Sequence, residues 1–390
     1  MKAYARALRS LFRESAKPSL KIKGYEFSIS EFAGSLGDFG PLNPFLIGYV
    51  AILGADPVGL FLMMGIANVV IGLLYNVPLS VEAKKAVGAT ALAQRWKPSQ
   101  LYAVGVGTGV AWTLLGFSGI TEKIVKVTPR CVVKGIQLSL VLTLILESIS
   151  LSRSNPLLAI SSVLLATLLL RIKRIGRYVP AAIFLFTVGL LFAISTDVIP
   201  WAGISFRIPS LRVPTIDEIL LTMITVGFAQ IFLTLGNAVI ATAALCQKYF
   251  PERKVSERHL ALNMGILNTV SPFFGGVPLC HGADGVASQY LFGARTGGSM
   301  ILEGILEIFL SLFFAGSIVA VFGAFPQPVI GAMLFLTAFE LTRVSVDLRT
   351  APDAVVILVV IVVSYISNLG AAFLVGIAVH FLLEKLRRHQ

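Results

Sequence analysis

The sequence predicts an all-α polytopic membrane protein with about 14 transmembrane segments in 7+7 inverted repeats, with half-helices in segments 3 and 10. Two observations predict this class. Of 390 residues, 56% are hydrophobic and only 13% are charged, against roughly 25% charged in an average soluble domain. A block of sequence also recurs at about half the chain length. The composition excludes an ordinary soluble protein.

Apolar runs bounded by charge, Pro or Gly mark the candidate segments. They cover residues 33–53, 57–75, 78–93, 99–117, 131–150, 156–171, 179–196, 216–244, 259–275, 278–292, 299–323, 326–342, 353–367 and 369–384. An ordinary spanning helix needs about 20 apolar residues. Segments 78–93 and 278–292 are too short or interrupted for that, so hydropathy alone does not identify them.

The basic residues give an independent check on this count. With a cytoplasmic N-terminus and fourteen crossings, 25 of the 32 Lys and Arg residues fall on the cytoplasmic side and five outside, as the positive-inside rule requires. Residues 1–30 are then a basic cytoplasmic arm without a cleaved signal, and the C-terminus is also cytoplasmic. Lys84 and Lys85 remain within a membrane segment. Topology in a cell membrane therefore explains the net charge of +12 without a nucleic-acid partner.

The internal repeat joins residues 64–83 to residues 264–283. Nine of the twenty positions are identical without a gap, including Asn68, Pro78 and Ala83. We therefore expect a first repeat over 31–196, an extracytoplasmic connection over 197–218 and a second repeat over 219–390. An odd number of crossings per repeat inverts the second copy, which is the architecture of many secondary transporters.

Both copies contain Val-Pro-Leu followed by a short, poorly hydrophobic stretch. Proline removes a backbone donor and disfavours helix before it, so each copy predicts an extended turn that leads into a half-helix. Non-helical backbone at membrane depth must be buried in protein or line an aqueous cavity. The amides after Pro78 and Pro278 would then form an anion site near the midplane.

Ionisable residues within the segments are functional candidates because their burial in a membrane is costly. The paired half-helices contain Glu82, Lys85, His281 and Asp284, and a Gly- and Pro-rich opening contains Asp38. In the eighth segment, Gln230, Thr234 and Asn237 share one helix face, where they bind substrate or act as polar contacts between helices. Glu147, Glu303 and Glu340 lie near segment ends and predict interfacial side chains, while Glu307 is deeper but without a constellation.

At these residues the chain resembles the molybdate transporter family, a branch of the sulfate-permease-like superfamily with the uracil-permease type of fold. The resembling stretches are GSLGDFGPLNPF at 34–45, VPLSVEAKKAV at 77–87, PRCVVKGIQLSL at 129–140, LTLGNAVIATAAL at 233–245 and GGVPLCHGADGVASQYLFGARTGGS at 275–299. The resemblance implies a core of segments 1–4 and 8–11 that moves against a gate of segments 5–7 and 12–14. It also implies an oxyanion between segments 1, 3, 8 and 10, and a possible homodimer.

The half-helices, the polar face and the resemblance together give the predicted substrate site. Its residues are Ser35, Gly37, Asp38, Glu82, Lys85, Gln230, Asn237, Cys280, His281, Gly282 and Ala283. The family usually has Gln at position 82 and Gly at position 284, so this chain brings two extra acidic groups near an anion site. The soluble regulatory domain of many sulfate permeases is not expected after the last apolar run.

The predicted function is secondary active transport of a tetrahedral oxyanion, with molybdate as the substrate. Fixed donors favour a fully deprotonated oxyanion over phosphate, which carries a proton. Moving a dianion inward against 100 mV costs about 4.6 kcal/mol, so we expect proton coupling through Asp38, Glu82 or Asp284. A carrier of sulfate or another oxyanion is the alternative, followed by an anion channel. The residues predict no enzyme, no cofactor and no metal site, since Cys131, Cys246 and Cys280 lie far apart.

Overall fold

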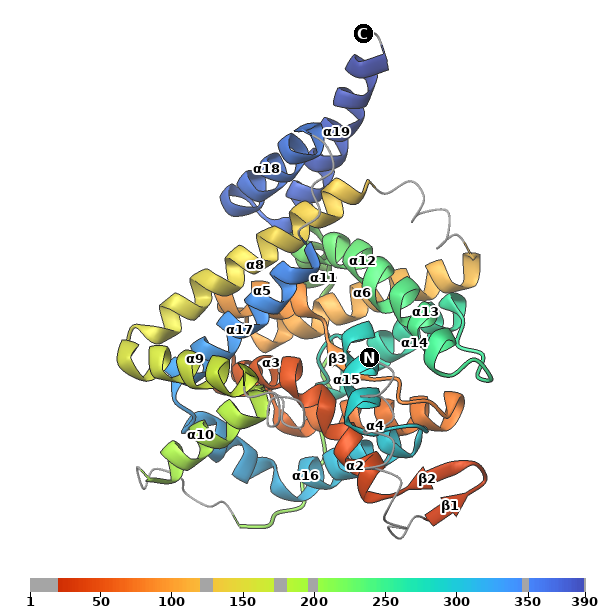
Figure 1. The fold of residues 1–390 in the computed structure, drawn as a ribbon, viewed down its shortest axis with the longest axis vertical. Coiled ribbons are helices and arrows are strands. Elements are labelled where there is room, and N and C mark those ends of the chain that lie inside the picture. Colours follow the sequence, from red (N-terminus) through yellow and green to blue (C-terminus); the bar gives the residue numbers. More distant parts are fainter. Residues whose placement is uncertain (1–19, 120–128, 172–180, 196–202, 346–350, 389–390) are drawn as a thin grey trace.

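A computed structural model describes residues 20–119, 129–171, 181–195, 203–345 and 351–388 (Figure 1). Within these ranges the chain is mostly helical. The helices of the first half are α2 (Ile29–Ser35), η1 (Leu36–Asp38), α3 (Phe39–Ala51), α4 (Pro57–Tyr75), α5 (Lys85–Ala93), α6 (Pro98–Ser118), α8 (Arg130–Ser152), α9 (Pro156–Arg171) and α10 (Ala181–Ser195).

The second half continues the helical pattern. Its elements are α11 (Ile216–Thr222), η2 (Met223–Gly227), α12 (Phe228–Thr234), η3 (Leu235–Ala241), α13 (Thr242–Tyr249), α14 (Glu257–Val270), η4 (Ser271–Phe274), α15 (Ala283–Phe292), α16 (Gly298–Gly323), α17 (Gln327–Ser345), α18 (Ala351–Ile366) and α19 (Leu369–Arg388). In the described part, six helical runs are long and apolar enough to cross a membrane. Helices α5 and α15 are much shorter, with nine and ten residues.

The expectation of an all-α chain is wrong in one respect, because the structure contains two short antiparallel strand pairs. Strand β1 (Leu20–Ile22) pairs with β2 (Tyr25–Phe27) in the expected N-terminal arm. Strand β3 (Val81–Ala83) pairs with β4 (Leu279–His281) between the two repeated blocks. An extended turn needs partners for its backbone when it is buried, and each turn here uses the other.

Helices far apart in the sequence pack against one another in a regular pattern. Helix α4 packs on α16 and α6 packs on α14, while α8 packs on α17. Because an offset of 200 converts α4 into α14 and α6 into α16, the first two contacts exchange under the repeat. Equivalent glycines make this close approach possible. A Cβ at Gly65 would come within 2.6 Å of the Gly304 carbonyl oxygen, and one at Gly265 within 2.6 Å of the Thr113 nitrogen.

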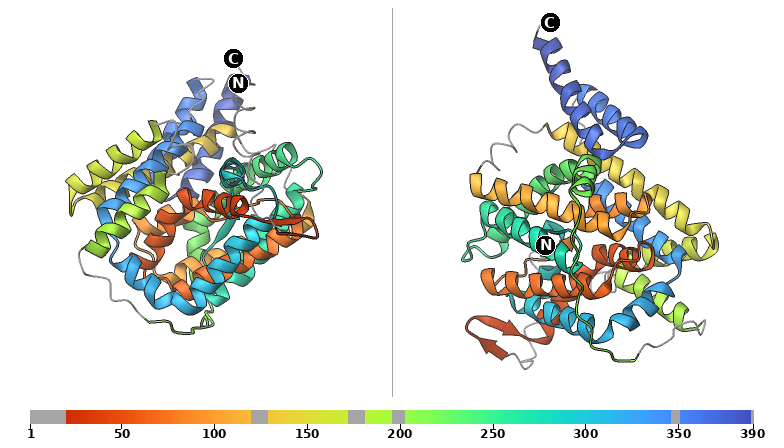
Figure 2. Two further views of the ribbon diagram at one scale, coloured as in Figure 1. Left: turned by 60° about the horizontal axis from the view of Figure 1, so that its bottom comes forward. Right: turned by 180° about the vertical axis from the view of Figure 1, so that it is seen from behind.

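The remaining helices form a second group. Helices α9 and α10 contact each other, as do α18 and α19, and both pairs adjoin α8 or α17. Helices α18 and α19 extend beyond the rest at the end that carries the C-terminus, opposite the β1–β2 hairpin (Figures 1 and 2).

The connection between the two halves, residues 203–215, forms no helix or strand. Arg207 donates its backbone N–H to Leu312 O at 2.8 Å, and Arg212 donates its backbone N–H to Phe273 O at 2.7 Å.

Candidate functional site

The two repeated blocks meet at the β3–β4 pair. Val81 pairs with His281, and these residues are equivalent positions of the repeat. Each strand leads directly into a short helix, β3 into α5 and β4 into α15. Ser80 also donates its hydroxyl to the Gly282 carbonyl at 3.4 Å, which extends the pairing by one residue on each chain segment. The first turns of both short helices therefore lie at the ends of one small sheet.

Glu82 and Lys85, both predicted site residues, form an ion pair. Lys85 Nζ lies 3.1 Å from Glu82 Oε2, and the Ser80 hydroxyl donates to Glu82 Oε1 at 3.3 Å. The Glu82 side chain is buried and that of Lys85 is nearly so. The acidic group at position 82 is therefore balanced locally by a cation, which a buried carboxylate needs.

Gln230, a predicted substrate residue, caps the first turn of α5. Its Oε1 accepts the backbone N–H groups of Ala86 at 3.1 Å and Val87 at 3.2 Å. Its Nε2 donates to the Thr234 hydroxyl at 2.8 Å, so the predicted i, i+4 relation is confirmed. Gln230 thus occupies amides in the first turn of α5 that the sequence assigned to an anion.

Helix α15 begins without such a cap. Gly282 precedes its first turn, and no side chain of the described residues caps that position. Ala283 is the first helical residue, and Cys280 faces Glu82 across the strand pair. The N-terminus of a helix presents backbone donors and the positive end of its dipole. Of the two short helices α5 and α15, α15 is therefore the one whose N-terminal amides are not occupied by a described side chain.

His281 is buried beside this helix end. Its side chain is 1% exposed, and Nδ1 lies 3.1 Å from the Ser80 carbonyl oxygen. A carbonyl only accepts, so Nδ1 carries hydrogen, and Nε2 has no hydrogen-bond partner within the described part. A proton on Nε2 would make this atom a charged donor.

Lys84 is a further candidate that is not among the predicted site residues. Its side chain is fully buried at 0% exposure, and its Nζ donates to the Thr108 hydroxyl at 2.6 Å. No carboxylate of the described residues lies within ion-pair distance of it. A buried ammonium without a counterion is costly, so an anion is the partner that this position favours. The sequence does contain a signal for this residue, because the predicted topology leaves both Lys84 and Lys85 within a membrane segment.

The first-segment residues adjoin α15. A Cβ at Gly37 would come within 3.0 Å of the Ser288 carbonyl oxygen in α15, so the two segments pack closely at this glycine. Ser35 is buried but donates to the Phe32 carbonyl at 2.8 Å, which closes its own helix. The side chains of Asp38, Asn237, Asp284 and Glu340 lie outside the described part of the structure.

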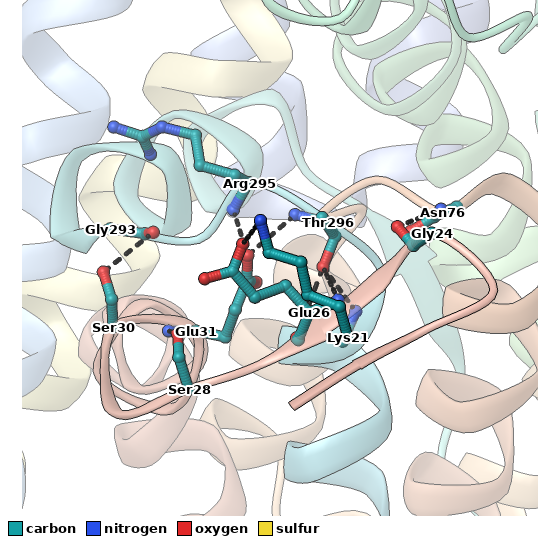
Figure 3. Close-up of polar contacts among 11 residues, drawn as sticks. Lys21, Gly24, Glu26, Ser28, Ser30, Glu31, Asn76, Gly293, Arg295 and Thr296 are labelled. Carbon is teal, nitrogen blue, oxygen red and sulfur yellow. Dashed lines mark hydrogen bonds and ion pairs between the residues drawn. The ribbon is translucent and has the colours of Figure 1, made fainter. Parts of the chain in front are cut away.

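The loop after α15 is attached to the N-terminal hairpin and α2 (Figure 3). Glu31 Oε1 accepts the backbone N–H of Arg295 at 2.9 Å and of Thr296 at 3.0 Å. Burial raises the pKa of Glu31, which precedes the first expected span, to about 7, although these two hydrogen bonds lower it. Asn76 accepts from Gly297 N at 2.9 Å, so both ends of this loop are fixed.

The interfacial environment expected for Glu303 is wrong, because its side chain is 2% exposed and accepts a hydrogen bond from Gln289 of α15. Glu307 is 1% exposed, as expected for a deeper residue, and accepts a hydrogen bond from Asn68 of α4. Glu147 is buried and pairs with Arg95 at 2.8 Å, so it is not a solvated interfacial group. A cavity of about 460 Å³ lies apart from the strand pair, between Asp56, Lys97 and Arg212.

Comparisons with known proteins identify the family of this chain. The family model described as "Molybdate transporter of MFS superfamily" matches residues 30–144 and 222–341. The chain belongs to the molybdate transporter family. The family resemblance of the sequence is thereby confirmed, and its known members are transporters rather than enzymes.

Curated family members align along most of the chain. Molybdate transporter 1 of Arabidopsis thaliana is 27% identical over 90% of this chain and 87% of its own length. Molybdate transporter 1 of Chlamydomonas reinhardtii is 34% identical, over 51% of this chain and 40% of its own. This family membership, together with the apolar helices, identifies a multi-pass membrane protein.

Solved structures establish the fold at lower identity. The transmembrane domain of the cyanobacterial bicarbonate transporter BicA has a TM-score of 0.61 and 14% identity, covering 90% of this chain and 96% of its own. The murine anion transporter Slc26a9 in the inward-facing state has a TM-score of 0.68 and 16% identity, covering 99% and 72%. The chain therefore has the mostly helical fold of these membrane transporters.

Proposed function

We propose that this protein carries molybdate across the cell membrane as a secondary active transporter. The observation that supports it best is Lys84, whose fully buried amino group donates to the Thr108 hydroxyl and lies within ion-pair distance of no described carboxylate. It lies directly after β3, whose partner strand leads into the uncapped first turn of α15. A tetrahedral dianion only accepts hydrogen bonds, so a cation and backbone donors suit it.

The carrier architecture that we propose is a 7+7 inverted repeat with α5 and α15 as the half-helices. The exchange of helix partners between the halves supports it, since α4–α16 and α6–α14 are equivalent contacts. Transport by alternating access then moves the group of α8 to α10 and α17 to α19 against the group that holds the strand pair. Both termini lie in the cytoplasm in this arrangement.

Proton coupling is part of the proposal. A dianion that enters against the membrane potential needs a driving force, and the buried Nε2 of His281 lacks a partner among the described residues. Protonation there would add a donor to the oxyanion. The acidic residues Asp38, Glu82 and Asp284 are the other proposed proton acceptors.

Uptake of labelled molybdate into proteoliposomes tests this function. We expect saturable uptake that is stimulated by an inward proton gradient and inhibited by tungstate. Stronger inhibition by sulfate than by tungstate would favour the alternative, a carrier of sulfate or other oxyanions. Currents far above carrier turnover would instead indicate an anion channel.

A further inference from the structure

Two buried carboxyl groups on α16 have no role in the site described above. Glu303 and Glu307 are one helical turn apart, and their side chains are almost fully buried. Like charges at this spacing repel each other, and an ionised carboxylate without a counterion is costly in a buried position. In the described part, no Lys, Arg or His lies within ion-pair distance of either.

Each carboxyl group receives one hydrogen bond from an amide. Asn68 Nδ2 of α4 donates to Glu307 Oε2 at 2.8 Å, and Gln289 Nε2 of α15 donates to Glu303 Oε2 at 3.3 Å. Three buried acceptors nearby have no donor within the described residues: Glu307 Oε1, Asn68 Oδ1 and Gln289 Oε1. Within the described residues, the cluster therefore has more hydrogen-bond acceptors than donors.

Among the residues that the structure describes, the elements around this pair supply no positive charge to it. Helices α3 and α4 contain no Asp, Glu, Lys, Arg or His. Helix α2 and strand β2 contribute Glu31 and Glu26, both acidic, and α15 contributes Asp284. Glu82 repels Glu303 electrostatically, and Lys85 is paired with Glu82.

We propose that Glu303 and Glu307 form a proton-binding site that holds at least one proton at neutral pH. A proton taken from water onto Glu307 Oε1 forms an O–H bond there, cancels one negative charge and converts an unpartnered acceptor into a donor. The hydroxide that remains is neutralised by the buffer. The predicted candidates Asp38, Glu82 and Asp284 do not include this pair.

The proton-binding site is connected to the oxyanion site through α15. Gly285 packs so closely on β3 that a Cβ there would come within 2.5 Å of Glu82 Oε1. Gln289, one turn further along α15, holds Glu303. Resting on the proposed function, we infer that loss of the proton from this pair lowers the affinity for the oxyanion.

Infrared spectroscopy of the purified protein in D₂O tests the proton directly. We expect a protonated carboxylic acid band at neutral pH that weakens in Glu303→Gln and in Glu307→Gln. Glu252→Gln, which alters an exposed glutamate, should leave it unchanged. Both variants retain an amide of similar shape, and the wild-type band is informative even if one variant misfolds.

Three results separate this proposal from the proposed function. A band of unchanged intensity in both variants, or no band in the wild type, would overturn the proton-binding site while molybdate binding could remain. A residual band is expected in both variants, because burial raises the pKa of Glu31 to about 7 and this carboxyl group also absorbs there. A melting temperature that rises with Na⁺ concentration to the same extent in the wild type and in both Gln variants would also overturn it. If the wild type binds no molybdate but shows the band, the transport function fails and the proton-binding site stands.

Discussion

The two strand-helix units at the centre, β3–α5 and β4–α15, occupy equivalent positions of the repeat but offer different chemistry. The first carries Glu82, Lys84 and Lys85, and its helix is capped by Gln230. The second carries no Lys or Arg before Arg295, and its helix begins at Gly282, where no side chain of the described residues caps it. The repeat thus positions both units, while single residues place the basic side chains Lys84 and Lys85 in the first unit and only the acidic Asp284 and His281 in the second.

Asn68 and Asn268 show the same division. Asn268 donates to Leu279 O at 2.6 Å and accepts from Leu279 N at 2.7 Å, so it holds β4 in place. Asn68, its equivalent, donates to Glu307 instead. Equivalent residues therefore support the strand in one half and a buried acid in the other.

The largest expected effect on molybdate affinity comes from removal of the Lys84 amino group of the first unit. Lys84→Met should weaken molybdate binding by about 10- to 100-fold, because a charge-assisted hydrogen bond contributes roughly 1.5–3 kcal/mol. Isothermal titration of the purified variant measures this. Lys254→Met, at an exposed position, is the control. Unchanged affinity in Lys84→Met would remove this lysine from the site.

Removal of the Gln230 cap should leave the first turn of α5 with free backbone amides, as in the first turn of α15. Gln230→Ala leaves the amides of Ala86 and Val87 without their acceptor. We expect a loss of about 1–3 kcal/mol in stability, measured as a lower melting temperature, and partial recovery of stability on addition of molybdate. Gln247→Ala, on an exposed position, should melt like the wild type. A variant that melts normally would show that the cap contributes nothing.

The ion pair of the first unit should moderate the affinity. Glu82→Gln removes a negative charge beside the site and releases Lys85 from its 3.1 Å contact. Molybdate binding should tighten by about two- to tenfold, since tenfold corresponds to roughly 1.4 kcal/mol. A binding titration at constant ionic strength checks this. Weaker binding would mean that Glu82 positions Lys85 for the substrate.

The smallest effect concerns the attachment of α2 to the loop after α15. Because burial raises the pKa of Glu31 to about 7 from 4.5, the folded state holds this proton more tightly than the unfolded state. The contribution of protonated Glu31 to the stability of the folded state is complete below about pH 4.5 and is lost as the pH rises through 7. Melting temperatures from pH 5 to 8 should depend less on pH in Glu31→Gln than in the wild type. An identical pH dependence would contradict the assignment.

Much of the fold follows from the sequence, for identifiable reasons. Apolar runs bounded by Pro and Gly predict the positions of helices such as α4 and α6, since these residues end or begin helices. The offset of 200 predicts that residues 77–83 and 277–283 are equivalent. Their pairing as strands is not predictable from either segment alone, because each is three residues long and depends on the other.

The candidate site follows less completely from the sequence. Polar residues in short apolar segments predict Glu82, Lys85 and His281, and the structure brings them together at the β3–β4 pair. The i, i+4 spacing placed Gln230 beside Thr234 but not beside the amides of α5, since that contact depends on tertiary packing. Hydropathy also does not distinguish a helix end at the lipid interface from one buried in protein. For this reason it predicts the wrong environment for Glu303, which is buried and contacts Gln289 of α15.

The central claim is that the uncapped α15 and the buried Lys84 together bind a tetrahedral dianion. A titration of the purified wild type and Lys84→Met with molybdate, tungstate and sulfate at two pH values tests it most directly. We predict that the wild type binds molybdate and tungstate more tightly than sulfate, and that Lys84→Met loses at least tenfold for all three anions. Equal affinities of the two proteins for molybdate, or no binding by the wild type, would contradict it.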